Sequence, residues 1–287
     1  MSHNIIDDTQ IDKPCLKRKK TVRECSFSLN VNTSSLCDSK TTDDKNKFPI
    51  VYDNKSVTLG EFCTSSLFTV AKERRELKHE LLYSSSTYEI YGHGTALNQA
   101  DLDNIYHIFI MFSDKNIDSA IEFTTYGFLK RKGSSLGEDN YNSLRASLRR
   151  IEEFKYVIRD KNTTRWIDVR FFKTLEGNER KNTFKLSLSD ILGKRIVEKC
   201  KFIPLDERNK MKTMVGKWLL SYLNDHRPEF FPTLIETLRL RSGATMNLYD
   251  FIRCIKKEYQ AFESIGYTLE ILNRGKAAKL YVTFPKK

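Results

Sequence analysis

The chain has 287 residues, a formal net charge of +12 and a sequence pI of about 9.3. This length is enough for two domains with their own hydrophobic cores, and the charge favours an acidic polymer as partner. The longest apolar run, Ile105 to Phe112, is interrupted by His107 and is too short to cross a bilayer. The first ten residues form no apolar signal core. We therefore expect a soluble cytoplasmic protein with no membrane partner.

The six cysteines lie far apart in the sequence, without a C-x-x-C pair or a nearby histidine pair. Such a distribution excludes the usual zinc spacings and is typical of reduced thiols in a cytosol-like compartment. We expect no metal and no cofactor. The six cysteines are Cys15, Cys25, Cys37, Cys63, Cys200 and Cys254.

Residues 1–60 are rich in Ser, Thr, Asp, Asn and Lys and contain few periodic apolar residues. A segment that cannot bury enough apolar surface stays disordered, so we predict a disordered tail. Within it, residues 17–20 are Lys-Arg-Lys-Lys. Such a run is a nuclear address, a nucleic-acid-binding arm or simply a solvated stretch.

The first folded domain is expected over residues 61–203, with strands over residues 66–70 and 88–91. A helix follows, because Asn98 with Asp101 three residues later fits an N-cap with an acidic first turn. The helix has an apolar stripe formed by Leu102, Ile105, Tyr106, Phe109 and Phe112. His93 and His107 have no partner at metal-ligand spacing, so we interpret both as structural.

A second and a third helix are predicted next. Residues 126–132 end in a basic run before Gly133, as helices often end at a glycine. Over residues 141–151 apolar side chains recur at helical steps beside Arg145 and Arg149. Apolar strands over residues 156–158 and 166–171 then flank a polar tip at residues 160–163. Helix, turn, helix and hairpin in this order indicate a winged helix.

Three segments of this domain resemble the TrfA/RepA-type plasmid replication initiators. The segments are Tyr91-Gly92-x-Gly94-x-x-Leu97-x-Gln99-x-Asp101-Leu102-Asp103, then Phe123-Thr124-Thr125-Tyr126-Gly127-Phe128-Leu129, and then Tyr141-x-x-Leu144-Arg145-Ala146-Ser147-Leu148-Arg149-Arg150. The resemblance covers roughly residues 67–171; the C-terminal half is similar in architecture only, and residues 1–55 are not covered. It implies a bacterial protein built from two winged-helix domains, which binds repeated origin sites called iterons, helps to open the origin and recruits host replication proteins.

The region between the two halves contains an apolar alternation over residues 184–188, which predicts a strand of the first domain. Residues 202–205 look like a connector. The second domain is expected over residues 204–287. Its first helix is predicted over residues 214–223 and stops before Pro228. Trp218 lies on the apolar face of this helix, so we place it in the core.

The second domain repeats the winged-helix order. A short amphipathic helix from Leu234 to Arg241 ends at Gly243, and apolar residues recur at helical steps from Leu248 to Phe262. Alternating strands around the turn Asn273-Arg274-Gly275 then predict a hairpin with a basic tip. The two copies lie about 110 residues apart, and internal repetition is stronger evidence than one motif. The predicted fold class is α+β, with two tandem winged helices.

Catalytic motifs are missing from the sequence. No phosphate-binding G-x-x-x-x-G-K-[ST] loop occurs, and none of the five histidines forms a His-x-His pair beside a nucleophilic tyrosine. We therefore expect a binding protein and not an enzyme.

The expected mechanism is recognition of double-stranded DNA by the second helix of each helix-turn-helix and by the two hairpin tips. Lysine and arginine would contact phosphates, while Arg253, Lys257 and Gln260 would contact base edges. An ordinary solvated helix face is the alternative for each. The predicted DNA-binding residues are Arg131, Lys132, Arg145, Arg149, Lys161, Arg239, Arg241, Tyr249, Arg253, Lys256, Lys257, Gln260, Arg274 and Lys276.

The resemblance also implies partners: origin repeats, host replication proteins such as a helicase and an initiator, and a second copy of the chain in an inactive homodimer joined through the first domain. Such initiators can also repress their own promoter. A transcriptional regulator without a replication role is the alternative function. A basic scaffold whose winged helices bind protein is a third.

Overall fold

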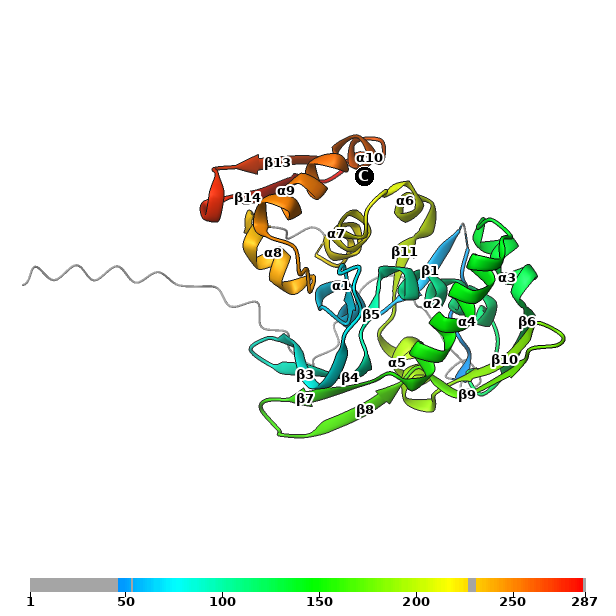
Figure 1. The fold of residues 1–287 in the computed structure, drawn as a ribbon. Helices are drawn as coiled ribbons and strands as arrows, with labels where there is room; N and C mark the ends of the chain where they lie inside the picture. The colour runs from blue at the N-terminus through cyan, green and yellow to red at the C-terminus, as the bar shows by residue number, and fades with distance from the viewer. Residues whose placement is uncertain (1–45, 53, 227–230, 286–287) are drawn as a thin grey trace, which may run out of the picture. The chain divides into compact units, whose positions relative to one another are not determined.

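The computed structural model describes residues 46–52, 54–226 and 231–285. Along these residues the chain forms helices and short strands (Figure 1). The N-terminal part up to the first winged helix contains β1 (Lys55–Thr58), α1 (Gly60–Thr64), β2 (Phe68–Thr69), β3 (Glu76–Ser84), β4 (Tyr88–Thr95) and β5 (Leu97–Asn98). The first winged helix contains α2 (Gln99–Phe112), β6 (Ala120–Thr124), α3 (Thr125–Lys132), α4 (Glu138–Glu153), β7 (Lys155–Asp160) and β8 (Trp166–Arg170).

The chain then continues through β9 (Phe172–Asn178), β10 (Thr183–Leu188), α5 (Asp190–Lys199), β11 (Lys201–Pro204) and α6 (Leu205–Lys210). The second winged helix contains α7 (Met214–Asp225), β12 (Thr233–Leu234), α8 (Ile235–Arg241), α9 (Leu248–Lys257), α10 (Tyr259–Glu263), β13 (Thr268–Leu272), the 3₁₀ turn η2 (Gly275–Ala277) and β14 (Lys279–Thr283). Both winged helices therefore share the order helix, short strand, two helices, hairpin, and the second adds the short helix α10 before its hairpin. The predicted fold class is confirmed.

Local capping sets the ends of the helices. Asn98 and Asp101 form a capping box at the start of α2, as predicted. Gly133 ends α3 with a φ of 70°, and Gly243 follows α8 with a φ of 66°. Both values lie in the left-handed region, which glycine adopts without the steric cost of a Cβ atom. The basic last turns before these two glycines therefore end as the sequence indicated.

The larger antiparallel sheets of the described first half have the strand orders β3-β4-β7-β8 and β6-β10-β9, and two-stranded pairs are formed by β1-β11 and β2-β5. The β7–β8 hairpin pairs Val157 with Asp168 and Arg159 with Trp166. In the second winged helix the sheet has the order β12-β14-β13. The predicted hairpins are thus present in both copies, and the first copy extends its hairpin into a four-stranded sheet.

The buried apolar side chains form two clusters. One contains residues from Phe48 to Leu205. The other contains Val70 and residues from Met211 to Val282, and it encloses Trp218, which is fully buried as predicted. Burial of this apolar surface is the main stabilising contribution for each cluster.

Parts of the chain differ from the sequence expectation. Residues up to 45 of the predicted disordered tail lie outside the described residues, but β1 lies within that predicted segment and pairs with β11. Phe48 is buried against Phe109 and Phe112, which explains why this stretch is ordered. The expected connector over residues 202–205 is accordingly the partner strand of β1 and the start of α6.

Several elements had no prediction. Helix α5 follows the sheet strand β10 because Ser189 caps it by accepting a hydrogen bond from the Leu192 amide. Strands β3 and β9 are rich in polar residues and lie at the edges of their sheets, so they show little hydrophobic alternation. Strand β4 continues through the glycines at 92 and 94, beyond the predicted end at residue 91. Among the described residues no helix is long and apolar enough to cross a membrane.

Candidate nucleic-acid interface

Helix α9 presents a basic face to solvent. The Asn247 side chain caps its start by accepting from the Asp250 amide at 2.9 Å. Phe251 and Ile255 are buried and fix the helix against the core. The exposed side chains on the other face are Tyr249, Arg253, Lys256 and Lys257. Tyr249 is 75% exposed, which leaves its ring available for contact with a ligand.

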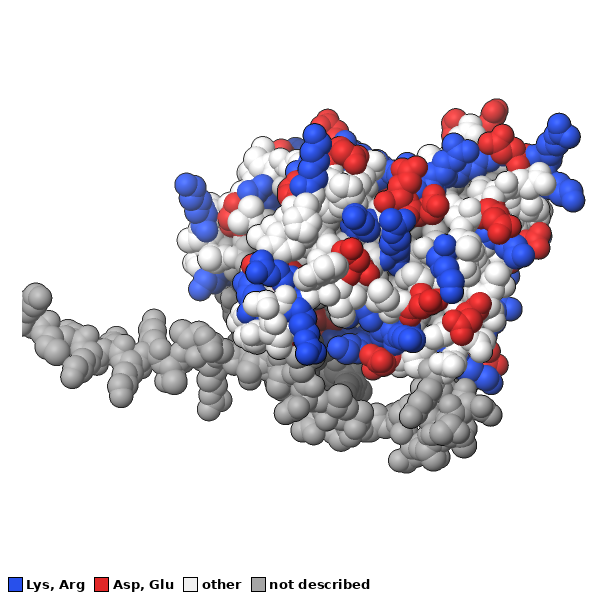
Figure 2. All heavy atoms as spheres, turned by 90° about the horizontal axis from the view of Figure 1, so that it is seen from below, with Lys and Arg blue, Asp and Glu red and all other residues white. Residues whose placement is uncertain are grey.

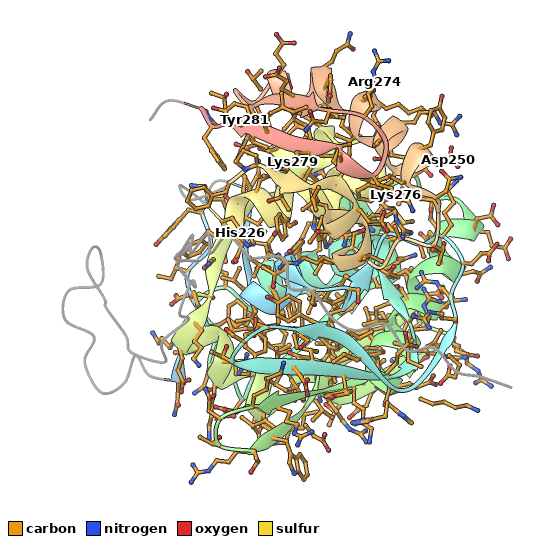
Figure 3. All side chains as sticks on the ribbon, turned by 90° about the vertical axis from the view of Figure 1, so that its left-hand side faces the viewer. His226, Asp250, Arg274, Lys276, Lys279 and Tyr281 are labelled. Atoms are coloured by element: carbon orange, nitrogen blue, oxygen red, sulfur yellow. The ribbon has the colours of Figure 1, made fainter. Side chains whose placement is uncertain are left out.

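The tip of the second hairpin lies beside this face, because η2 and α9 are neighbours. Arg274 and Lys276 are exposed at the tip. Figure 3 shows Arg274, Lys276 and Asp250 on one side of the hairpin, with Tyr281 on the other. The structure therefore brings the predicted wing residues and the start of α9 together on one surface. This is the geometry in which a winged helix places one helix in the major groove and its wing on the backbone.

The two predicted arginines of α8 contact the protein itself. Arg239 donates to both carboxylate oxygens of Glu236, at 2.7 and 2.8 Å, and to the carbonyl of Met246 at 2.9 Å. The hydrogen bond from Arg239 lowers the pKa of the Glu236 carboxyl. Arg241 donates to the Tyr222 hydroxyl at 2.7 Å. Their contacts hold α8 against the α8–α9 turn and against α7.

The predicted helix from residue 248 to 262 is wrong in one respect, since it breaks at Glu258. The buried Glu258 carboxylate accepts from the amides of Thr213 at 2.6 Å and Lys212 at 3.1 Å. A Cβ atom on Gly216 would lie 2.6 Å from Glu258 Cδ, so the contact needs glycine there. The Glu258 carboxylate thus lies at the N-terminal end of α7. Gln260 belongs to α10, beyond the end of α9.

In the first winged helix the arginines of α4 face other elements. Arg145 donates to the side chain of Asn182. Arg149, which is exposed, lies 3.4 Å from Glu179, and Arg150 donates to the buried Asp101 at 3.0 Å. Each contact joins α4 to the β9–β10 turn or to α2, so this helix is held by its polar side chains as well as by its apolar ones.

The remaining predicted residues of the first winged helix, Arg131, Lys132 and Lys161, differ in their exposure and in their hydrogen-bond partners. Arg131 is exposed on α3. Lys132 is partly buried and donates to Asn104 at 2.6 Å, and burial lowers the pKa of its ammonium group. Lys161, at the β7–β8 tip, donates to the Ser84 hydroxyl at 2.8 Å and lies 3.4 Å from Glu89. The structure does not gather these three with the α4 arginines into one free surface.

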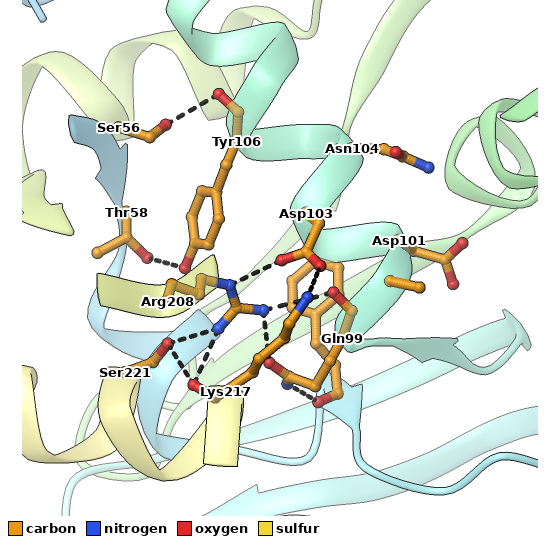
Figure 4. A network of polar contacts seen from close by, with 12 residues as sticks. Ser56, Thr58, Gln99, Asp101, Asp103, Asn104, Tyr106, Arg208, Lys217 and Ser221 are labelled. Atoms are coloured by element: carbon orange, nitrogen blue, oxygen red, sulfur yellow. Dashed lines mark hydrogen bonds and ion pairs between the residues drawn. The ribbon is translucent and has the colours of Figure 1, made fainter. Parts of the chain in front are cut away.

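Sequence reasoning missed a buried polar network centred on Arg208, which the structure encloses completely (Figure 4). Arg208 donates to Asp103 at 2.7 Å and to the Gln99 side chain at 2.8 Å, and Lys217 donates to the second oxygen of Asp103 at 2.5 Å. Burial opposes ionisation of Asp103, but Arg208 and Lys217 hold its pKa below the usual range. The network joins α2 to α6 and α7. No local pattern could indicate it, because Asp103 and Arg208 are 105 residues apart.

The face of the molecule that lies opposite the second winged helix shows no surface of one charge. Seen from the side on which β7 and β8 lie, lysine and arginine side chains are mixed with acidic and uncharged ones (Figure 2). No group of three potential metal ligands occurs in the part of the chain that the structure describes. The basic face of α9 with the wing tip is therefore the strongest candidate interface.

No protein-family model matches the chain, and no curated protein sequence matches it. Several solved structures match the chain in fold. Domains 2 and 3 of RctB superpose with a TM-score of 0.55 at 13% identity, over 77% of this chain and 95% of that one. A second RctB structure of the same domains gives 0.51 at 12% identity, over 75% and 93%. The Pi initiator protein, solved in complex with iteron DNA, gives 0.55 at 9% identity, over 81% and 97%.

At these identities the likeness shows the fold. The chain has the tandem winged-helix fold of replication initiator proteins. The resemblance that residues 67–171 carried is confirmed at this level, and it extends to the C-terminal half. None of the fourteen predicted DNA-binding residues is tested by the likeness, so each stays a prediction.

Proposed function

We propose that the protein is a replication initiator that binds repeated double-stranded DNA sites at an origin. The observation that supports this most strongly is the exposed basic face of α9 beside the tip of the β13–β14 hairpin, on a fold shared with a protein solved on iteron DNA. In this proposal α9 enters the major groove, Arg253 and Lys257 contact base edges, and Arg274 and Lys276 contact phosphates.

The finer parts of the proposal follow from the initiator role. Binding would help to open the origin, recruit host proteins such as a helicase and an initiator, and repress the protein's own promoter. The chain would do this in the bacterial cytoplasm by binding alone, without catalysis.

The experiment that tests the role combines two measurements. Selection of bound sequences from random duplexes gives the preferred site, and a small circle carrying this gene with its flanking DNA is assayed for replication in bacteria. Direct repeats of about twenty base pairs, with replication of the circle, support the initiator. A single palindrome without replication supports a transcriptional regulator. Absence of duplex binding leaves the scaffold function.

We also propose that a monomer is the DNA-binding form and a homodimer joined through the first winged helix is inactive. A dimer on inverted half-sites needs centres about 34–36 Å apart, whereas a monomer with two winged helices binds one direct repeat asymmetrically. Light scattering after size exclusion, with and without a single-repeat duplex, distinguishes the two. Two chains per repeat would contradict the monomer.

A further inference from the structure

The outer face of the β3-β4-β7-β8 sheet holds a groove of about 810 Å³, and the proposed duplex site does not use it. Strand pairing places Tyr91, Val157 and Asp168 in one row across three strands. Side chains on a strand alternate between the two faces, so Tyr156, next to Val157, is fully buried in the core. The row that lines the groove is therefore turned to solvent by the register of the sheet.

Aromatic rings lie open on this face. Trp166 is 62% exposed. The ring of His79 stacks on the ring of Tyr91, with centroids 4.6 Å apart and planes 1° from parallel. Trp166 and Tyr91 belong to β8 and β4, which are separated by one strand and so lie about 10 Å apart, and the two residues are offset by two positions along the strands. The face thus presents two separate flat apolar surfaces.

The position of His79 depends on a strained backbone. It is the extra residue of a bulge between Lys78 and Glu80, and its φ is 58°, in the left-handed region. A non-glycine residue rarely adopts this conformation, and such strain concentrates at functional sites. The bulge places the imidazole ring over Tyr91.

Cations surround the aromatic rings. Lys155 and Arg159 line the groove, and Arg170 is the cross-strand partner of Lys155 on the same face. Two carboxylates lie on the same face: Asp168 lines the groove, and Glu89 is the cross-strand partner of Arg159, so the three cations outnumber the acids. The groove therefore combines a positive charge with open ring faces, which suits a ligand that is both anionic and aromatic.

We propose that this groove binds single-stranded nucleic acid. Unpaired bases would stack on Trp166 and on the Tyr91–His79 pair, while the phosphates between them would contact Lys155 and Arg159. Every base has a ring face, so such a site tolerates any sequence. A duplex keeps its ring faces inside the helix, and an acidic peptide would leave the aromatic rings unused. This inference is independent of the proposed duplex site, because it depends on other residues.

The two tryptophans of the chain make the test specific, since Trp218 is fully buried and Trp166 is exposed. An oligothymidine of about 12 nucleotides, within the usual site size for one such module, is titrated against the full-length protein. We expect saturable quenching of tryptophan fluorescence that is absent in Trp166→Phe. In Trp166→Ala, anisotropy of a labelled oligomer should show affinity lower by about 5- to 150-fold.

The matched control is Ile167→Ala, the next residue of the same strand, which should bind the oligomer like the original protein. Arg159→Ala should weaken oligomer binding and reduce its salt dependence, whereas Lys185→Ala, exposed on β10, should not. Circular dichroism and thermal melting of each variant establish that it is folded. An oligouridine in parallel shows whether RNA binds as well as DNA, and binding of either supports the proposal.

Three results would overturn the proposal. One is the absence of oligomer binding or of Trp166 quenching. Another is equal binding by thymidine monophosphate at the same nucleotide concentration, which would indicate a small-molecule pocket. The third is an equal loss of duplex and oligomer binding in folded Trp166→Ala, which would make the groove part of the duplex site. Failure of duplex binding alone, with oligomer binding intact, would reject only the proposed function.

Discussion

Both winged helices carry arginines on their third helix, but they place them differently. In α4, Arg145, Arg149 and Arg150 contact Asn182, Glu179 and Asp101, which belong to other elements. In α9, Arg253 forms an ion pair with Asp250 of the same helix, at 2.9 Å. An arginine that satisfies buried acceptors contributes to stability, whereas one on an open face remains available to a ligand. Similar sequence patterns thus produce one helix with two partly buried arginines that bond to other elements, and one helix with an open basic face that we propose contacts DNA.

The largest expected effect is that of salt on duplex binding. Six to ten phosphate contacts lower affinity about 10³- to 10⁵-fold between 50 and 200 mM salt. Combined replacement of Lys256, Arg274 and Lys276 by alanine should reduce the slope of log affinity against log salt by about three, roughly one for each phosphate contact. Replacing Arg145 and Arg149 should change it less. Fluorescence anisotropy over this salt range measures both, and a nearly flat titration would contradict backbone contact altogether.

The second prediction tests the anchoring of α4. Asp101 is buried and accepts from Arg74 at 2.5 Å, Ser147 at 2.7 Å and Arg150 at 3.0 Å. Asp101→Ala removes the buried carboxylate that two partly buried arginines share, which costs about 3–5 kcal/mol of unfolding free energy. Glu179→Ala removes only an exposed ion pair and should cost less than about 1 kcal/mol. Chemical denaturation measures both; equal costs would show that α4 is not held by Asp101.

A pH dependence should come from the first winged helix, where α2 carries His107. Burial, with a smaller contribution from Lys132, lowers the pKa of His107 to about 4 from its usual value of 6.5. The unfolded chain therefore binds a proton that the folded chain does not, and stability is lost as pH falls from about 6.5 to about 4. We expect a loss on the order of 1–3 kcal/mol in this window.

His107→Phe should reduce this pH dependence. His93→Phe is the control, because His93 is exposed on β4. Denaturant unfolding at a series of pH values gives both curves. An unchanged pH profile in folded His107→Phe would assign the dependence to other groups.

The smallest effect separates base contacts from phosphate contacts in the second winged helix. Arg253→Ala should weaken the specific site by about 1–3 kcal/mol and relax the preference at one base pair. Arg274→Ala or Lys276→Ala, at the wing tip, should weaken all duplexes about equally. Competition assays with single-base variants of the selected site measure this. If Arg253→Ala weakened every sequence alike, α9 would contact only the backbone.

The sequence by itself determined the elements that depend on near neighbours. The period of apolar residues, the Asn98 cap and the glycines at 133 and 243 each act within a few positions along the chain, so the helices, the hairpins and the repeated winged-helix order were predictable. The basic face of α9 was predictable for the same reason, since it follows from helical spacing.

Only the tertiary structure decided which polar side chains stay free. Thr69 donates to the carbonyl of Gly243, 174 residues away, and Glu258, where the predicted helix breaks, accepts from the amide of Thr213, 45 residues earlier. Arg241 and Lys132 looked like surface cations in the sequence, but they donate to Tyr222 and Asn104, which are 19 and 28 residues away. A buried or half-buried charge needs a partner, and that partner is set by packing and not by position in the sequence. For this reason the sequence located the candidate surface, but the packing separated its exposed cations from those that hold the fold together.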